Sequence, residues 1–109
     1  MSLPIGSRWM IHRALDTGAP VSDQRIEILS SAGGQFTAKY ISIADPSAFT
    51  GEIGQRQGEV INIKQHNQER GYLAFHSGLR VGTKNEYAGR WYSNAGEAGA
   101  FQLSQLAHA

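Results

Sequence analysis

The sequence predicts an all-β domain built as an antiparallel up-and-down β-barrel. Apolar and polar residues alternate with a period of two along most of the 109-residue chain, which is the pattern of half-buried strands. Clusters of Gly, Pro, Asp and Asn interrupt the alternation about every ten residues, and each break is short enough for a hairpin. About eight strands in so short a chain leave too few residues for two thick sheets, and closure into a barrel removes the exposed edges. A six-stranded barrel and a small sandwich are the alternatives.

Each strand is predicted from the alternation between two turn clusters. In the first half of the chain we expect strands at residues 8–14, 25–31, 35–42 and 48–55. In the second half we expect them at residues 59–66, 71–80, 85–93 and 100–106. The main breaks fall at residues 16–20, 32–34, 44–47, 67–70, 82–84 and 94–96, which are rich in turn residues: glycine permits a positive φ and proline fixes φ.

Alternate residues of a strand share one face, so the more apolar set of each strand is the expected interior. That set consists of Trp9 and Ile11; Ile26 and Ile28; Phe36, Ala38, Tyr40 and Ser42; Phe49, Gly51 and Ile53; Ile61 and Ile63; Tyr72, Ala74, His76 and Gly78; Tyr87, Gly89 and Trp91; and Phe101 and Leu103. The strand at 71–80 is ambiguous, because its other face is more apolar and carries Leu73, Phe75, Ser77 and Leu79. Either its phase is reversed or its outer face is covered by another subunit, which favours a homo-oligomer.

Composition excludes several classes of function. A formal charge of +1 gives no cluster of cations for a phosphate backbone, so nucleic acid is not an expected partner. The absence of cysteine excludes disulfides and thiolate metal sites. No apolar run reaches the roughly 20 residues of a membrane span, and the first five residues lack the features of a signal peptide. We expect one soluble domain over residues 1–109, cytoplasmic or secreted after processing.

The expected interior suggests a pocket for a small molecule. Small residues at Ala38, Gly51, Ala74 and Gly89 leave room, since an eight-stranded barrel either fills with side chains or holds one small ligand. The rings and polar groups facing that room would be those of Trp9, Tyr40, Ser42, Tyr72, His76 and Trp91. The alternative is that these residues are core aromatics whose polar ends find a partner at a barrel mouth.

Several segments carry a family resemblance, in order and at similar spacing. They are Trp9, Gly34-Gln35-Phe36-Thr37-Ala38-Lys39-Tyr40-Ile41-Ser42, Phe49-Thr50-Gly51-Glu52, His76-Ser77-Gly78 and Gly89-Arg90-Trp91. With these segments the chain resembles the avidin and streptavidin family of β-barrels. The resemblance implies that Tyr40 and Ser42 match the hydroxyl pair that binds the ureido oxygen of biotin, and that Trp91 matches a wall tryptophan.

The sequence departs from that family at other positions of the biotin site. Ile11 stands where the family has an asparagine donor, and His76 stands where an aromatic wall residue is expected. The family's tryptophan and aspartate near the last strand fall in the short segment Glu97-Ala98-Gly99. Each unpaired polar edge of biotin would cost about 1–3 kcal/mol, which argues against high-affinity biotin binding.

No pattern of catalytic or metal-binding residues stands out. The four histidines, His12, His66, His76 and His108, lack the paired spacing of a metal site. His76 is the only one on the expected interior face, where no carboxylate would orient it as a base and only Ser42 offers a nucleophile. We therefore expect no enzyme, no metal and no cofactor.

The favoured interpretation is a non-enzymatic barrel that binds a small, partly apolar ligand. One alternative is a carbohydrate-binding surface, because polar and aromatic residues gather near the turns: Arg70, Arg80, Arg90, Tyr92, Gln65, Asn67, Gln68, Asn85 and Asn94. Another is a structural subunit with a filled barrel that assembles through Leu73, Phe75 and Leu79. The sequence does not identify the ligand.

Overall fold

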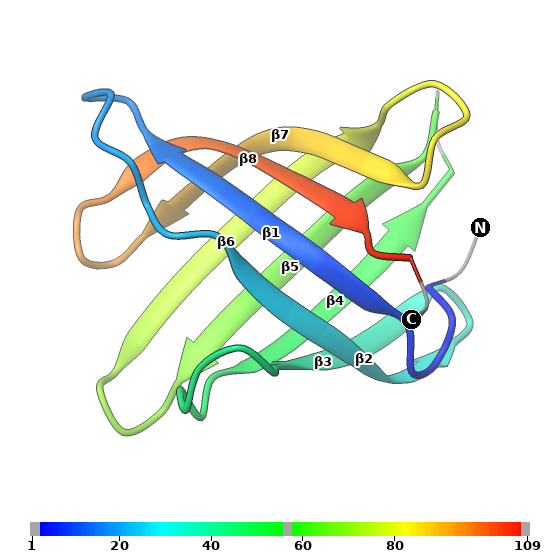
Figure 1. Ribbon diagram of the computed structural model, residues 1–109, viewed down its shortest axis with the longest axis horizontal. Coiled ribbons are helices and arrows are strands. Elements are labelled where there is room, and N and C mark those ends of the chain that lie inside the picture. Colours follow the sequence, from blue (N-terminus) through cyan, green and yellow to red (C-terminus); the bar gives the residue numbers. More distant parts are fainter. Residues whose placement is uncertain (1–2, 56–57, 108–109) are drawn as a thin grey trace.

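Eight antiparallel strands close into one barrel in the computed structural model, which describes residues 3–55 and 58–107 (Figure 1). The strands are β1 (Arg8–Leu15), β2 (Gln24–Ala32), β3 (Gln35–Tyr40), β4 (Ala48–Gly54), β5 (Val60–Asn67), β6 (Tyr72–Arg80), β7 (Glu86–Ser93) and β8 (Ala98–Gln105). Each strand pairs with the next, and β8 pairs with β1 to close the barrel. The predicted fold class is confirmed, and every predicted strand is found with its ends shifted by at most two residues.

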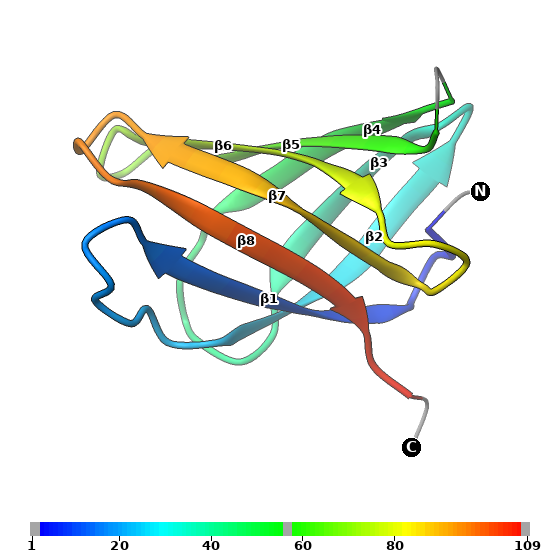
Figure 2. The ribbon, with the colours of Figure 1, turned by 90° about the horizontal axis from the view of Figure 1, so that it is seen from above.

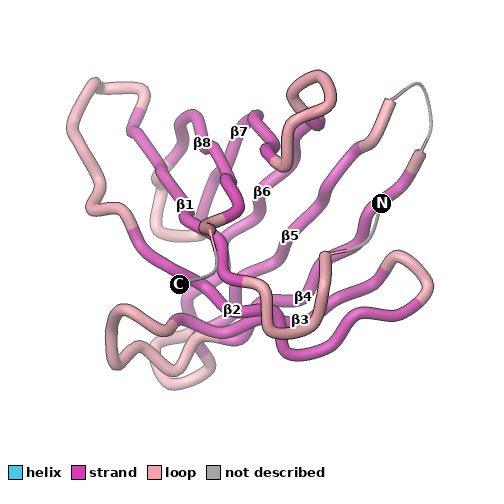
Figure 3. Tube along the Cα trace, turned by 45° about the vertical axis from the view of Figure 1, so that its right-hand side comes forward, coloured by secondary structure: helices cyan, strands magenta, loops and turns pink. Residues whose placement is uncertain are grey.

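Strands and loops account for the whole described backbone (Figure 3). Within residues 3–55 and 58–107, no helix is long and apolar enough to span a bilayer. Because eight strands close into one barrel, the two alternatives, a small sandwich and a six-stranded barrel, are wrong.

In every strand the predicted interior face is the more buried one, although Ser42, beyond the end of β3, is exposed. The most completely buried large side chains include Trp9, Phe49, Tyr87, Trp91 and Leu103, each 2% exposed or less. In strand β6, whose orientation the sequence left ambiguous, the predicted interior residues Ala74 and His76 are buried. Phe75 and Leu79 on the other face are 38% and 54% exposed, so the phase is not reversed. The apolar outer face of β6 is thus real.

The small interior residues do not leave the expected cavity. A Cβ on Gly51 would lie 2.3 Å from Cζ of Phe36, so the Phe36 ring already fills that space. A Cβ on Gly89 would lie 2.0 Å from the carbonyl oxygen of Ser77, so this glycine allows two strands to approach closely. Most of the barrel interior is filled by side chains, and the room for a ligand lies elsewhere.

The two ends of the barrel differ. The links β2–β3, β4–β5 and β6–β7 lie at one end together with the amino-terminal segment, as Figures 1 and 2 show. Leu3 of that segment is 1% exposed and joins the core, and Gly6 and Ser7 hydrogen-bond to the backbone of Ile28. The other end, where β1–β2, β3–β4, β5–β6 and β7–β8 turn, is the end that carries the site.

Candidate functional site

The rows of interior residues become polar at one end of the barrel. Every second residue of a strand faces the interior. On β1 the interior residues Trp9 and Ile11 are followed by Arg13. On β5 Gln65 and Asn67 follow Ile61 and Ile63, and on β7 Ser93 follows Trp91. Odd strands end and even strands begin at this end, because the barrel is antiparallel. The polar residues therefore meet around one opening.

The opening is a hollow of about 620 Å³, which we call the barrel mouth. Six residues define it here: Arg13, Tyr40, Gln65, Tyr72, Trp91 and Glu97. Its volume lies within the range of about 300–1,000 Å³ that is usual for small-molecule pockets.

Arg13 is the buried cation of the barrel mouth, with 5% of its surface exposed. Its Nη1 donates to Oε1 of Gln65 at 3.0 Å, and its Nη2 donates to the hydroxyl of Tyr40 at 2.7 Å. Its Cζ lies 5.4 Å from the centre of the Trp91 ring, within range of a cation–π contact. Among the described residues Nε has no hydrogen-bond partner, and none of the ion pairs involves Arg13.

A chain of hydrogen bonds continues from Gln65 to the β3–β4 link. Nε2 of Gln65 donates to the Tyr40 hydroxyl at 3.1 Å and to Oγ of Ser47 at 3.2 Å. Ser47 donates in turn to the carboxylate of Asp45 at 2.6 Å, and Asn67 donates to the same oxygen at 3.2 Å. This network orients the amide of Gln65 and uses Asp45 as a local acceptor.

Glu97 organises the opposite side of the barrel mouth. The hydroxyls of Tyr72 and Ser93 both donate to its Oε1 at 2.8 Å. Burial, with the hydrogen bond to Glu97, raises the pKa of Tyr72 to about 12, so the phenol stays protonated and acts as a donor. Glu97 begins the short segment where the avidin family's tryptophan and aspartate would fall, and it is not among the predicted site residues, but its carboxylate lines the barrel mouth.

His76 lies beneath the barrel mouth, packed between aromatic rings. Its ring is stacked with Trp91 at a centroid distance of 6.0 Å and meets Phe101 edge-on at 5.2 Å. Within the described part of the chain neither ring nitrogen makes a hydrogen bond of normal geometry. Burial, followed by the charge of Arg13, lowers the pKa of His76 to about 3, against a weak opposing effect of the Ile63 carbonyl. The ring is neutral at physiological pH.

The structure brings together three of the six residues predicted for the site. Tyr40, Tyr72 and Trp91 line the barrel mouth, and His76 packs against Trp91 from below. Trp9 is buried near the opposite end of the barrel, where its indole donates to Ser7 at 2.9 Å and its ring centroid lies 6.3 Å from that of Tyr87.

The prediction that Ser42 faces the interior is wrong. Strand β3 ends at Tyr40, and the exposed Ser42 turns sideways toward the edge of β2. Its hydroxyl accepts from the amide of Arg25 and donates to the side chain of Gln24, both at 2.9 Å. These bonds replace the strand pairing that would have kept the alternation.

The sequence interpretation missed Arg13 and misplaced Gln65 and Asn67. The two amides are each 3% exposed, although they were expected near surface turns. The available signal was the period of two: Arg13 follows Ile11 by two positions, and Gln65 follows Ile63 by two. A prediction based on apolar residues alone ends each interior row at its last apolar member, and the buried polar residues Arg13 and Gln65 are the next members of their rows.

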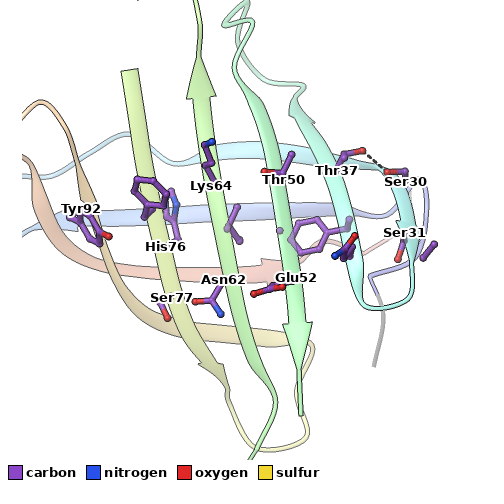
Figure 4. Close-up of a pocket in the computed structure, with 16 residues that line it drawn as sticks. Ser30, Ser31, Thr37, Thr50, Glu52, Asn62, Lys64, His76, Ser77 and Tyr92 are labelled. Atoms are coloured by element: carbon purple, nitrogen blue, oxygen red, sulfur yellow. Dashed lines mark hydrogen bonds between the residues drawn. The ribbon is translucent and has the colours of Figure 1, made fainter. Parts of the chain in front are cut away.

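A second hollow, of about 690 Å³, lies on the outer face of the sheet, and Figure 4 shows it. We call it the outer hollow; exposed side chains of β4 to β7 line much of it, including Thr50, Asn62, Lys64, Phe75 and Tyr92. The rings of Phe75 and Tyr92 are stacked at 5.5 Å and inclined by 27°. Most side chains of the outer hollow are exposed, but the buried Phe36, Ile63 and His76 also line it. Several buried polar groups, by contrast, line the barrel mouth.

No group of three His, Asp or Glu side chains within residues 3–55 and 58–107 is placed to hold a metal ion, and His108 lies outside the described residues. In comparisons with known proteins, no family model, no curated protein and no solved structure matches the chain. The closed eight-stranded barrel is compatible with the avidin-like fold that the sequence resembles.

Proposed function

We propose that this chain is a non-enzymatic binding protein that takes up one small organic ligand at the barrel mouth. The observation that carries the proposal is the change from apolar to polar interior residues on β1 and β5 at the end where Arg13, Gln65 and Asn67 line a hollow. A barrel that only needed to be stable would continue its apolar rows, because a buried polar group costs free energy unless it is paired.

The barrel mouth has the composition of a recognition site. Trp91 and Tyr72 supply ring surfaces, and Arg13, Tyr40 and Gln65 supply fixed polar groups. Most of the lining residues are polar, and Val21, Ile43 and Ala95 are the aliphatic ones. A few oriented donors and acceptors are a common feature of small-molecule sites. A ligand with a flat apolar body and one polar end fits this arrangement.

Binding without chemistry is favoured by the neighbours of His76. Its ring meets the rings of Trp91 and Phe101, and the carboxylate of Glu97 is engaged by hydroxyl donors. A general base must itself lie within hydrogen-bond distance of the proton that it removes, and the ring nitrogens of His76 have no such partner among the described residues. The resemblance to avidins extends, in our proposal, to ligand uptake at one end of the barrel, with biotin bound weakly because the buried Ile11 offers no donor.

The two tryptophans provide the test, because they lie at opposite ends of the barrel. The indole of Trp91 donates to the carbonyl of Ala14 at 3.3 Å beside the barrel mouth, whereas the indole of Trp9 donates to Ser7. In a ¹H–¹⁵N spectrum with a panel of small molecules that includes biotin, we expect ligands to shift the Trp91 indole signal and to leave that of Trp9 in place. Ligands that shift neither signal, or both equally, would contradict the proposal.

A carbohydrate site on the outer hollow is the second candidate. The stacked rings of Phe75 and Tyr92, 38% and 59% exposed, offer a platform for a sugar face beside the side chains of Asn62 and Lys64. Asn94 does not support the earlier expectation of a loop site, since its amide bonds to the backbone of Leu73 and Gly71. Glycan-array binding that disappears in Tyr92→Ala and survives Tyr72→Phe would favour this candidate.

Assembly through the same outer face is the third candidate. Leu79 and Phe75 of β6 and Tyr92 of β7 are its exposed apolar side chains. A dimer or tetramer measured by light scattering, converted to monomer by Leu79→Glu, would support it. A strict monomer would exclude it.

A further inference from the structure

We infer that the ligand of the barrel mouth is a small carboxylate, whose single negative charge is bound by Arg13. This inference rests on the proposed function, and it names the chemical class of the ligand. It follows from the burial of Arg13, from its unused donors and from the charges around the barrel mouth.

The first step is that the charge of Arg13 has no direct counter-ion among the described residues. The contacts of its guanidinium are the Gln65 amide, the Tyr40 hydroxyl and the Trp91 ring, all of them uncharged. Asp45 and Glu97 also line the hollow, but their hydrogen bonds come from hydroxyl and amide donors. A buried charge is costly unless a partner of opposite charge reaches it, so the barrel mouth favours an anion.

The second step is that Arg13 retains donors for such an anion. A guanidinium has five N–H groups, and the two hydrogen bonds to Gln65 and Tyr40 use two of them. Those bonds also hold the plane of the guanidinium in place. A fixed planar fork of N–H groups matches the two oxygens of a carboxylate.

The third step is that the surroundings select a single negative charge. Asp45 and Glu97 stand on two sides of the hollow, and each would repel an anion with two charges. Neither Arg70 nor His76 adds a second buried cation, because Arg70 is exposed and the buried ring of His76 is neutral above about pH 3. The half-buried ring of Tyr72 suits an apolar body behind the carboxylate. A monocarboxylate satisfies these conditions, and inorganic phosphate does not.

The test compares each carboxylate with its uncharged amide on the unaltered protein. Benzoate and benzamide form one pair, hexanoate and hexanamide the other, and inorganic phosphate is the third arm. The Trp91 indole signal reports binding, with the Trp9 signal as internal reference. We expect at least one carboxylate to bind roughly ten- to a hundredfold more tightly than its amide, because the amide has no negative charge and only one acceptor oxygen for the guanidinium.

Two variants of Arg13 and one control assign the effect. Arg13→Met removes the charge at similar length and is expected to bring the carboxylate to the affinity of the amide, while Arg13→Lys keeps the charge without the fork and is expected to bind at an intermediate level. Arg70→Met, which removes an exposed cation lining the same hollow, is expected to change binding by less than about twofold. If Arg13→Met does not fold, the affinity of Arg13→Lys and the comparison of carboxylate with amide show whether the charge of Arg13 binds the ligand.

The outcomes separate this inference from the proposed function. Equal binding of carboxylates and amides, or unchanged binding in Arg13→Met, would overturn the inference and leave a neutral-ligand site. Phosphate binding as tightly as the best carboxylate would overturn the selection for one charge. If the Trp91 signal responds to none of these probes and to no member of the wider panel, the proposed function itself fails.

Discussion

His76 makes the stability of the barrel depend on pH in a range where carboxylates are still fully ionised. Its ring is 1% exposed and packs against Trp91 and Phe101. Burial is the main reason that its pKa falls from 6.5 to about 3. Between these two values the unfolded chain binds a proton at His76 and the folded chain does not, so acid favours unfolding.

The magnitude follows from the two pKa values. Above pH 6.5 His76 is neutral in both states and does not change the free energy of unfolding. Below pH 6.5 the free energy of unfolding falls by about 1.4 kcal/mol per pH unit. Between pH 7 and pH 5 the free energy of unfolding is therefore expected to decrease by about 2 kcal/mol. His76→Phe should abolish this decrease and should be at least as stable at pH 7, because it also removes two ring nitrogens that lack normal hydrogen bonds.

Urea unfolding followed by tryptophan fluorescence at pH 7, 6 and 5 measures the effect. His66→Gln is the matched control, since His66 is an exposed histidine on the neighbouring strand β5 and its variant should keep the pH dependence. A free energy of unfolding that is flat from pH 7 to pH 5 in the unaltered protein would refute the reasoning. So would an equal slope in His76→Phe.

Two further predictions concern packing and surface charge. Gly51→Ala is expected to lower the free energy of unfolding by about 1–3 kcal/mol, because the new Cβ would lie 2.3 Å from the Phe36 ring. Gly54→Ala in the same strand should be nearly neutral, since its Cβ would meet no described atom within 4 Å, and equal urea midpoints for the two variants would be evidence against this account. Asp16→Asn breaks an ion pair with Arg90 at 2.6 Å but should leave the thermal midpoint almost unchanged, because both side chains are more than half exposed. A large drop in that midpoint would show that the pair is part of the fold.

The fold was predictable because its signals are local. Alternation with a period of two and glycine-rich turns suffice to place each strand and its buried face, and neighbouring strands in the chain are neighbours in the barrel. The end of β3 was misplaced at Ser42, because the hydrogen bonds of Ser42 to Gln24 and Arg25 join residues far apart in the sequence.

The site was only partly predictable, since hydropathy does not distinguish a buried polar residue from an exposed one. Tyr40, Tyr72 and Trp91 were found because their rings fit the apolar rows. Arg13 was missed because a charged residue at the end of a strand is normally solvated. What buries Arg13 is the closure of the barrel, which brings Gln65 within hydrogen-bond distance across 52 positions of the chain.

The position of Arg13 separates the requirements of the site from those of the fold. An apolar side chain there would extend the row of Trp9 and Ile11, and replacing a buried charge by an apolar residue of similar size is often neutral or stabilising. The hydrogen bonds that Arg13 makes to Gln65 and Tyr40 are buried, but both partners line the hollow, so water can take the place of a removed guanidinium. The fold then gains little from this arginine, and the proposed carboxylate would account for its burial at the barrel mouth. In Arg13→Met the loss of carboxylate binding with a retained free energy of unfolding is the combination that this reasoning requires.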